Sequence, residues 1–94
     1  SAVSGVFAVD AMLENGDQYK GVANVGHRPT VCGTRTQLEV HLFNFSQDIY
    51  GEHVKVTFHH KIRDEKKFAS FDELKLQIQK DSKTAKDFFN ISAH

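Results

Sequence analysis

The dipeptide Asn15-Gly16 limits the fold of this chain more than any other local feature, because it separates two runs of strand-forming residues. Residues 5–14 (GVFAVDAMLE) precede it, and residues 18–26 (QYKGVANVG) follow it. An Asn-Gly pair between two apolar runs is a strong signal for a tight hairpin. The sequence therefore predicts that these two runs pair as antiparallel strands.

Two more strand patterns follow, after a predicted loop. Residues 27–36 (HRPTVCGTRT) are expected to form this loop, because Pro29 has no N–H to donate to a strand ladder and glycine permits turns. We expect a third strand at residues 37–45. Residues 53–62 (HVKVTFHHKI) alternate apolar and polar side chains, which predicts a fourth strand with one buried face.

The last part of the chain has a helical pattern. Ser70 and Glu73 match a capping box, which predicts that a helix begins directly after Ser70. Leu74 and Ile78 are one turn apart, so both are expected on the inner face of this helix. Asp81 is predicted to cap a second, short helix.

This order of elements favours one domain over residues 1–94, with strands at about 5–62 and helices at about 71–90. Strands followed by helices are typical of an antiparallel sheet or small barrel with helices at one side. The 39% apolar and 26% charged residues fit a globular domain of this kind.

Charge and cysteine content limit which binding partners and which covalent cross-links are expected. The 12 basic and 12 acidic residues predict no broad attraction to nucleic acid or to a membrane surface. Cys32 is the single cysteine, which excludes an intramolecular disulfide and is compatible with a cytoplasmic location. Its loop thiol is either reactive or inert. Because a strand pattern begins almost directly after Ser1, we expect the chain to be a domain of a longer polypeptide.

Period two divides the third predicted strand into two faces. One face carries Leu38, Val40 and Leu42, and the opposite face carries Glu39, His41 and Phe43. A lone glutamate on a strand commonly faces solvent, but a carboxylate also accepts protons in catalysis. From the residues alone, both interpretations of Glu39 stay open.

The sequence contains no phosphate-loop, zinc or dinucleotide-binding signature. His59 and His60 are adjacent in a predicted strand, so their side chains are expected on opposite faces, which disfavours a shared metal site. The cluster Arg63, Lys66 and Lys67 either clamps an anion or is a solvated loop.

Five segments in a fixed order nevertheless carry a family resemblance: GVFAV, YKGVANVGHRPTV, LEVHLFNFSQDIYGE, KIRDEKKFASFDELKLQI and DSKTAKDFF. Together they resemble the riboflavin kinase module of bacterial bifunctional riboflavin kinase/FAD synthetases, over nearly all of residues 5–89. The resemblance implies a six-stranded antiparallel β-barrel with a C-terminal helix. It also implies transfer of the ATP γ-phosphate to the 5′-hydroxyl of riboflavin, which gives FMN and ADP.

The resemblance assigns roles to individual residues. Glu39 matches the catalytic base of the family. Positions that line the nucleotide site match Leu42, Asn44 and Tyr50, although Tyr50 also fits a packing aromatic. A flap that closes over the flavin matches Arg63, Lys66 and Phe68, although a mobile charged loop fits them too.

One family element is missing from this sequence. The family carries an earlier segment with a Pro-Thr-Ala-Asn motif, whose Thr and Asn hold the Mg²⁺ that accompanies ATP. Residues 28–31 (RPTV) are a different family element. The resemblance thus implies an incomplete barrel without metal ligands in this chain, and weak or no kinase activity of the chain alone. Exposed sheet edges are then expected to favour self-association.

The expected partners are ATP or ADP, riboflavin or FMN, and an N-terminal FAD synthetase (nucleotidyltransferase) domain that converts FMN to FAD. Two alternatives to a kinase stay open. In the first, the chain is a non-catalytic flavin- or nucleotide-binding β-barrel. In the second, it is an interaction module without a small ligand.

Overall fold

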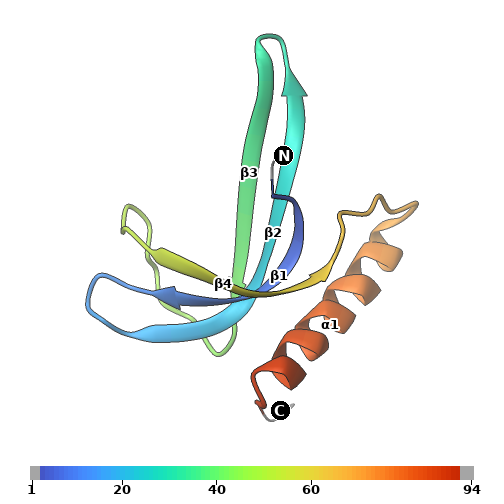
Figure 1. Cartoon of the computed structure of the whole chain (residues 1–94). Coiled ribbons are helices and arrows are strands. Elements are labelled where there is room, and N and C mark those ends of the chain that lie inside the picture. The colour runs from blue at the N-terminus through green and yellow to red at the C-terminus, as the bar shows by residue number, and fades with distance from the viewer. Residues whose placement is uncertain (1–2, 92–94) are drawn as a thin grey trace.

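The protein is a four-stranded antiparallel sheet with one helix against one face (Figure 1). The computed structural model describes residues 3–91, so Ser1 and the expectation attached to it lie outside the described part. The sheet has the order β3-β2-β1-β4. Its elements are β1 (Gly5–Met12), β2 (Gln18–Thr30), β3 (Gly33–Leu42), β4 (Lys55–Arg63) and α1 (Phe71–Phe88). The sheet stays open between β3 and β4, as expected for an incomplete antiparallel barrel.

The predicted first hairpin is confirmed: β1 and β2 pair antiparallel, with Met12 opposite Gln18. The turn is longer than two residues. The Leu13 N–H donates to the Asp17 carbonyl at 2.9 Å, and the Asp17 N–H donates to the Asn15 side chain at 2.9 Å. The Asn-Gly signal therefore gave the right pairing, within a wider turn.

The prediction of a loop at residues 27–36 is wrong, because β2 continues to Thr30 and β3 begins at Gly33. These strands form a two-stranded arm that extends beyond β1 (Figure 1). Pairing of β1 with β2 ends at Val25. Pro29 therefore lies where β2 has no neighbour on its second side, and an edge position tolerates the missing N–H. Cys32 is exposed in the turn at the tip of the arm.

The expectation that His59 and His60 point to opposite faces is also wrong. In the pairing of β1 with β4, Val9 faces Phe58 and Ala8 faces His60, so the register shifts at this point. Such a β-bulge leaves His59 without an opposite residue and breaks the period of two. The His59 ring meets the Phe89 ring edge-on at 5.6 Å, and the His60 ring stacks on Phe88 at 4.9 Å. Both rings therefore reach the C-terminal end of α1.

The sheet is buried on both faces only along its centre. On the face away from the helix, a cluster forms from Phe7, Val9, Ala23 and Val25, with Val56 packed against it. On the helix side, Ala8, Phe43 and Ala85 are buried together, and Val22, Ile62, Phe89 and Ile91 pack around them. Strand β3 ends at Leu42, earlier than the predicted end at residue 45, so Phe43 lies just beyond the strand. The core consequently follows β1, while β3 and β4 form the outer edges.

A single helix replaces the two predicted ones. The predicted start is confirmed, because the Glu73 N–H donates to the Ser70 hydroxyl at 3.2 Å and Ala69 N–H donates to the Glu73 carboxylate at 3.0 Å. Asp81 does not cap a second helix; it lies buried in the middle of α1. No helix within residues 3–91 is long and apolar enough to cross a membrane.

Candidate functional site

The main cavity, of about 530 Å³, lies between the helix-side face of the sheet, α1 and residues 64–70, which we call the flap loop. The strands contribute polar and apolar walls, and the flap loop and helix form the opposite side. Its lining residues are Val6, Val22, Asn24, Arg28, Glu39, Val40, His41, Arg63, Glu65, Lys66, Phe68, Leu74, Ile78, Asp81 and Ser82.

Glu39 lies in this cavity, on the face of β3 that the alternation predicted. The carboxylate is exposed, and no hydrogen bond or ion pair of the described residues engages it. Asn24 on β2 is directly opposite Glu39 in the strand register, and it lines the same cavity. A carboxylate that is free to accept a hydrogen bond therefore faces a space that is open to a ligand.

Phe68 brings an aromatic ring to the same cavity from the flap loop. The Arg63 guanidinium carbon lies 5.8 Å from the ring centroid, and the Lys66 ammonium lies 5.5 Å from it. Both distances allow cation–π attraction. The structure thus brings Arg63, Lys66 and Phe68 together with Glu39. Lys67 does not line this cavity; it lines a neighbouring hollow of about 240 Å³, to which Lys66 and Phe68 also contribute.

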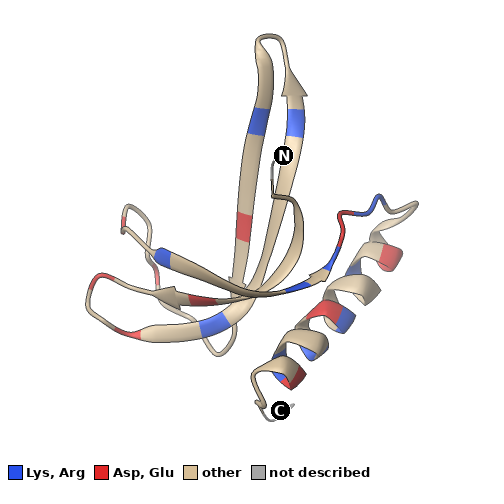
Figure 2. Ribbon diagram, in the orientation of Figure 1, with Lys and Arg blue, Asp and Glu red and all other residues tan. Residues whose placement is uncertain are grey.

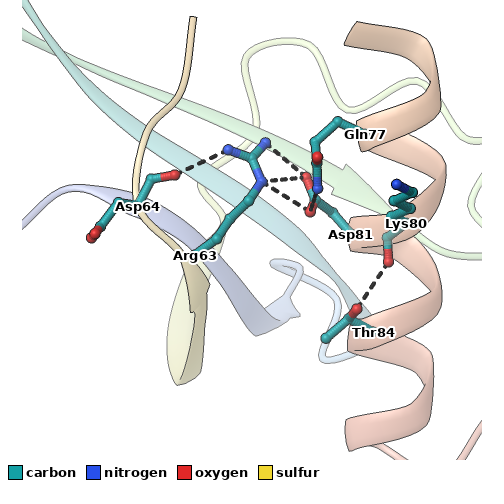
Figure 3. Close-up of polar contacts among 6 residues, drawn as sticks. All are labelled: Arg63, Asp64, Gln77, Lys80, Asp81 and Thr84. Atoms are coloured by element: carbon teal, nitrogen blue, oxygen red, sulfur yellow. Dashed lines mark hydrogen bonds and ion pairs between the residues drawn. The ribbon is translucent and has the colours of Figure 1, made fainter. Parts of the chain in front are cut away.

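Arg63 is bound to α1 through Asp81, a contact that the sequence did not predict (Figure 3). The Arg63 Nε–H lies 3.0 Å from both carboxylate oxygens of Asp81, and Nη2 donates to Oδ2 at 2.8 Å. Gln77 adds a third donor at 3.0 Å. A carboxylate between the apolar positions Ile78 and Ala85 was the available signal, because a buried charge requires a partner.

The three residues assigned to the nucleotide do not share one cavity. Leu42 lines a second cavity of about 470 Å³, with Leu38, Val40, His41, Phe45, Ile49, Val54 and Val56. Asn44 follows β3 in a turn with φ of 55°, and Tyr50 is 98% exposed. Tyr50 is therefore not a packing aromatic in this structure. All three residues lie at or after the end of β3.

The charged side chains are dispersed, and both signs occur along α1 and across the strands (Figure 2). Among residues 3–91, no group of three or more His, Cys, Asp or Glu side chains is arranged to hold a metal ion. Any local preference for anions rests on side chains such as Arg63 and Lys66.

Comparison with known proteins gives the family. The family model described as riboflavin kinase (flavokinase) matches residues 2–89. This chain belongs to the riboflavin kinase family. The motifs that carried the resemblance in the sequence thus identified the family correctly.

Curated members of the riboflavin kinase family are similar over most of this chain. The bifunctional riboflavin kinase/FMN adenylyltransferase of Haemophilus influenzae is 59% identical over 88 residues, which are 94% of this chain. The protein of the same name in Escherichia coli K12 is 50% identical over 92 residues, and that of Bacillus subtilis is 41% identical over 90 residues. The chain spans 29% of the length of the first two relatives and 28% of the third.

A solved structure agrees with the fold of this riboflavin kinase family member. The crystal structure of a protein described as a macrolide-efflux protein from Streptococcus pneumoniae has a TM-score of 0.84 and 38% identity. The match covers 89% of this chain and 27% of that chain. The arrangement of this chain's antiparallel strands and C-terminal helix therefore also occurs within a longer chain of known structure.

Proposed function

We propose that this chain is the C-terminal portion of a riboflavin kinase domain, which transfers the ATP γ-phosphate to the 5′-hydroxyl of riboflavin and releases FMN and ADP. One observation carries the proposal. A single cavity of about 530 Å³ is lined by the candidate base Glu39 and by the candidate flavin contacts Arg63, Lys66 and Phe68. Its volume lies within the range of about 300–1,000 Å³ that is common for small-molecule sites.

Glu39 is proposed to act as the general base. The riboflavin 5′-oxygen attacks the γ-phosphorus, its proton passes to the Glu39 carboxylate, and the bond to the β–γ bridging oxygen breaks to release ADP. An alcohol is a weak nucleophile, so a carboxylate within hydrogen-bond reach orients it and accepts its proton. The free state of the Glu39 carboxylate among the described residues supports this role.

The flap loop is proposed to hold the flavin. The Phe68 ring offers an apolar face for stacking on the isoalloxazine system. Lys66 and Arg63 lie beside that ring and offer positive charge to a phosphate. Closing such a loop over a ligand also excludes water from the reacting groups.

The nucleotide is proposed to contact Leu42, Asn44 and Tyr50, which follow Glu39 at the end of β3 and beyond it. Mg²⁺ is proposed to arrive with ATP, where it neutralises phosphate charge. The names of the curated relatives include FMN adenylyltransferase. The whole polypeptide is therefore proposed to convert FMN to FAD as well, with an N-terminal nucleotidyltransferase domain and in the cytoplasm.

The test uses the full polypeptide that the gene encodes around this chain, incubated with riboflavin and MgATP. The proposal predicts FMN and ADP in equal amounts, separated by chromatography. Flavin binding without FMN would favour a non-catalytic flavin-binding barrel. The absence of both binding, by flavin fluorescence, and turnover would favour an interaction module and overturn the proposal.

A further inference from the structure

We infer that Asp81 is a positioning residue of the cavity, which acts through Arg63 to fix the flap loop and Phe68 over the ligand. The inference rests on the proposed function for the nature of the ligand. The link between the helix and the loop rests on the contacts of this chain alone (Figure 3).

Asp81 is placed to control one partner. It is 4% exposed, and among residues 3–91 it is the only buried polar or charged residue. Its carboxylate accepts from Arg63 at 2.8 and 3.0 Å and from Gln77 at 3.0 Å. A buried carboxylate is stable only when it is paired and hydrogen-bonded, so the Arg63 fork has one strongly favoured orientation.

Arg63 carries this orientation into the flap loop. It is the last residue of β4, and its Nη1 donates to the Asp64 carbonyl, the first carbonyl of the loop, at 3.0 Å. The same guanidinium lies 5.8 Å from the Phe68 ring. The far end of the loop is held by the Ser70 cap of α1. One guanidinium therefore joins the helix, the strand end and the ring that lines the cavity.

The pairing with Asp81 does not use all of the N–H donors of Arg63. A guanidinium has five N–H groups. The hydrogen bonds of Arg63 use Nε–H, one N–H of Nη2 and one N–H of Nη1. One N–H on each terminal nitrogen thus has no partner among residues 3–91, and Arg63 lines the cavity. Asp81 therefore orients Arg63 while leaving donors for an anionic or carbonyl oxygen of the ligand.

The test compares Asp81→Asn with Asp87→Asn in the full polypeptide. Both changes remove one carboxylate charge from α1, but Asp87 pairs with Lys83 on the exposed face. Two readouts are measured: amide hydrogen exchange of residues 64–70 without ligand, and KM for riboflavin against kcat. A purely structural role would alter exchange throughout the domain, and would not separate KM from kcat.

For Asp81→Asn, we expect exchange in the flap loop and KM for riboflavin to rise roughly tenfold, with a smaller change in kcat, as loss of positioning implies. Values for Asp81→Asn that equal those of Asp87→Asn would overturn the inference. If Asp81→Asn does not fold, Arg63→Lys replaces it, because lysine keeps the charge and loses the fork. Unchanged flap exchange in folded Arg63→Lys would likewise overturn it.

The two proposals fail separately. If the unaltered polypeptide makes no FMN, the proposed function fails, but the exchange of residues 64–70 still decides whether Asp81 fixes the loop. If FMN forms and neither exchange nor KM responds to Asp81→Asn, only the positioning role is lost.

Discussion

Asn24 on β2 and Glu39 on β3 lie directly opposite each other in the strand register, and both line the main cavity. Side chains at facing positions of antiparallel strands lie about 4.5–5.5 Å apart at Cβ. The floor of the cavity therefore combines an amide and a carboxylate, and its composition depends on the pairing of β2 with β3. A slip of one residue in that pairing would turn Glu39 to the other face.

Phe68→Ala is expected to weaken riboflavin binding roughly tenfold, because we propose that the flavin stacks on this ring, which lines the main cavity. Fluorescence titration of riboflavin measures the effect. Phe71→Ala is the matched control, since Phe71 is 74% exposed and does not line the cavity. Equal affinities of the two variants would count against flavin stacking on Phe68.

Asp10→Asn is expected to lower stability in a pH-dependent way. Burial alone raises the pKa of Asp10, but hydrogen bonds and charges from Lys20 and His59 outweigh burial and hold that pKa below its ordinary value of 3.8. Because the native pKa is depressed, the ionised group stabilises the fold above about pH 3.8, and this contribution is lost as the pH falls through the native pKa.

Melting temperatures of wild type and Asp10→Asn at pH 7 and pH 3 measure this effect. We expect Asp10→Asn to lower the free energy of unfolding by about 1 kcal/mol at pH 7, typical of a partly buried charged hydrogen bond. At pH 3 we expect a smaller difference between the two proteins. Asp87→Asn, which alters an exposed ion pair, is the control and is expected to shift the melting temperature little. A difference that does not depend on pH would show that Asp10 acts through shape alone.

The 94-residue chain, studied by itself, is expected to self-associate through its open sheet edges. Leu38 on the outer strand β3 is 48% exposed. A lysine on an edge strand opposes strand pairing, so Leu38→Lys is expected to shift the chain toward monomer in light scattering. Leu76→Lys on α1 is the control, because it adds the same charge away from the sheet edge and is expected to leave self-association unchanged. A chain that is monomeric at high concentration before any substitution would contradict this expectation.

The fold was predictable from sequence where short-range signals decide the structure. Asn15-Gly16 predicted the first hairpin, and the Ser70 cap predicted the start of α1. Pro29 misled the prediction, because pairing with Thr34 on the arm outweighs its local preference for a loop. The predicted helix break at Asp81 failed for a similar reason, since its side chain is bound by Arg63 from another element.

The residues of the candidate site were predictable only where a local pattern or a family motif pointed to them. Alternation alone gave the face on which Glu39 lies, and the family motifs pointed to Arg63, Lys66 and Phe68. Asn24 was missed, because its place opposite Glu39 depends on the register between two strands. Residues whose position depends on a distant partner have no signal in their own neighbourhood of the sequence.

The most direct test of the account is the rate of FMN formation in single turnover by the full polypeptide and its Glu39→Gln variant, with riboflavin affinity measured on the same samples. Loss of a general base is expected to slow the chemical step by about 10²- to 10⁴-fold, while riboflavin affinity changes little. Asp87→Asn serves as the control for removal of one carboxylate charge. A near-normal rate in Glu39→Gln would contradict the central claim that Glu39 takes the proton from the flavin hydroxyl.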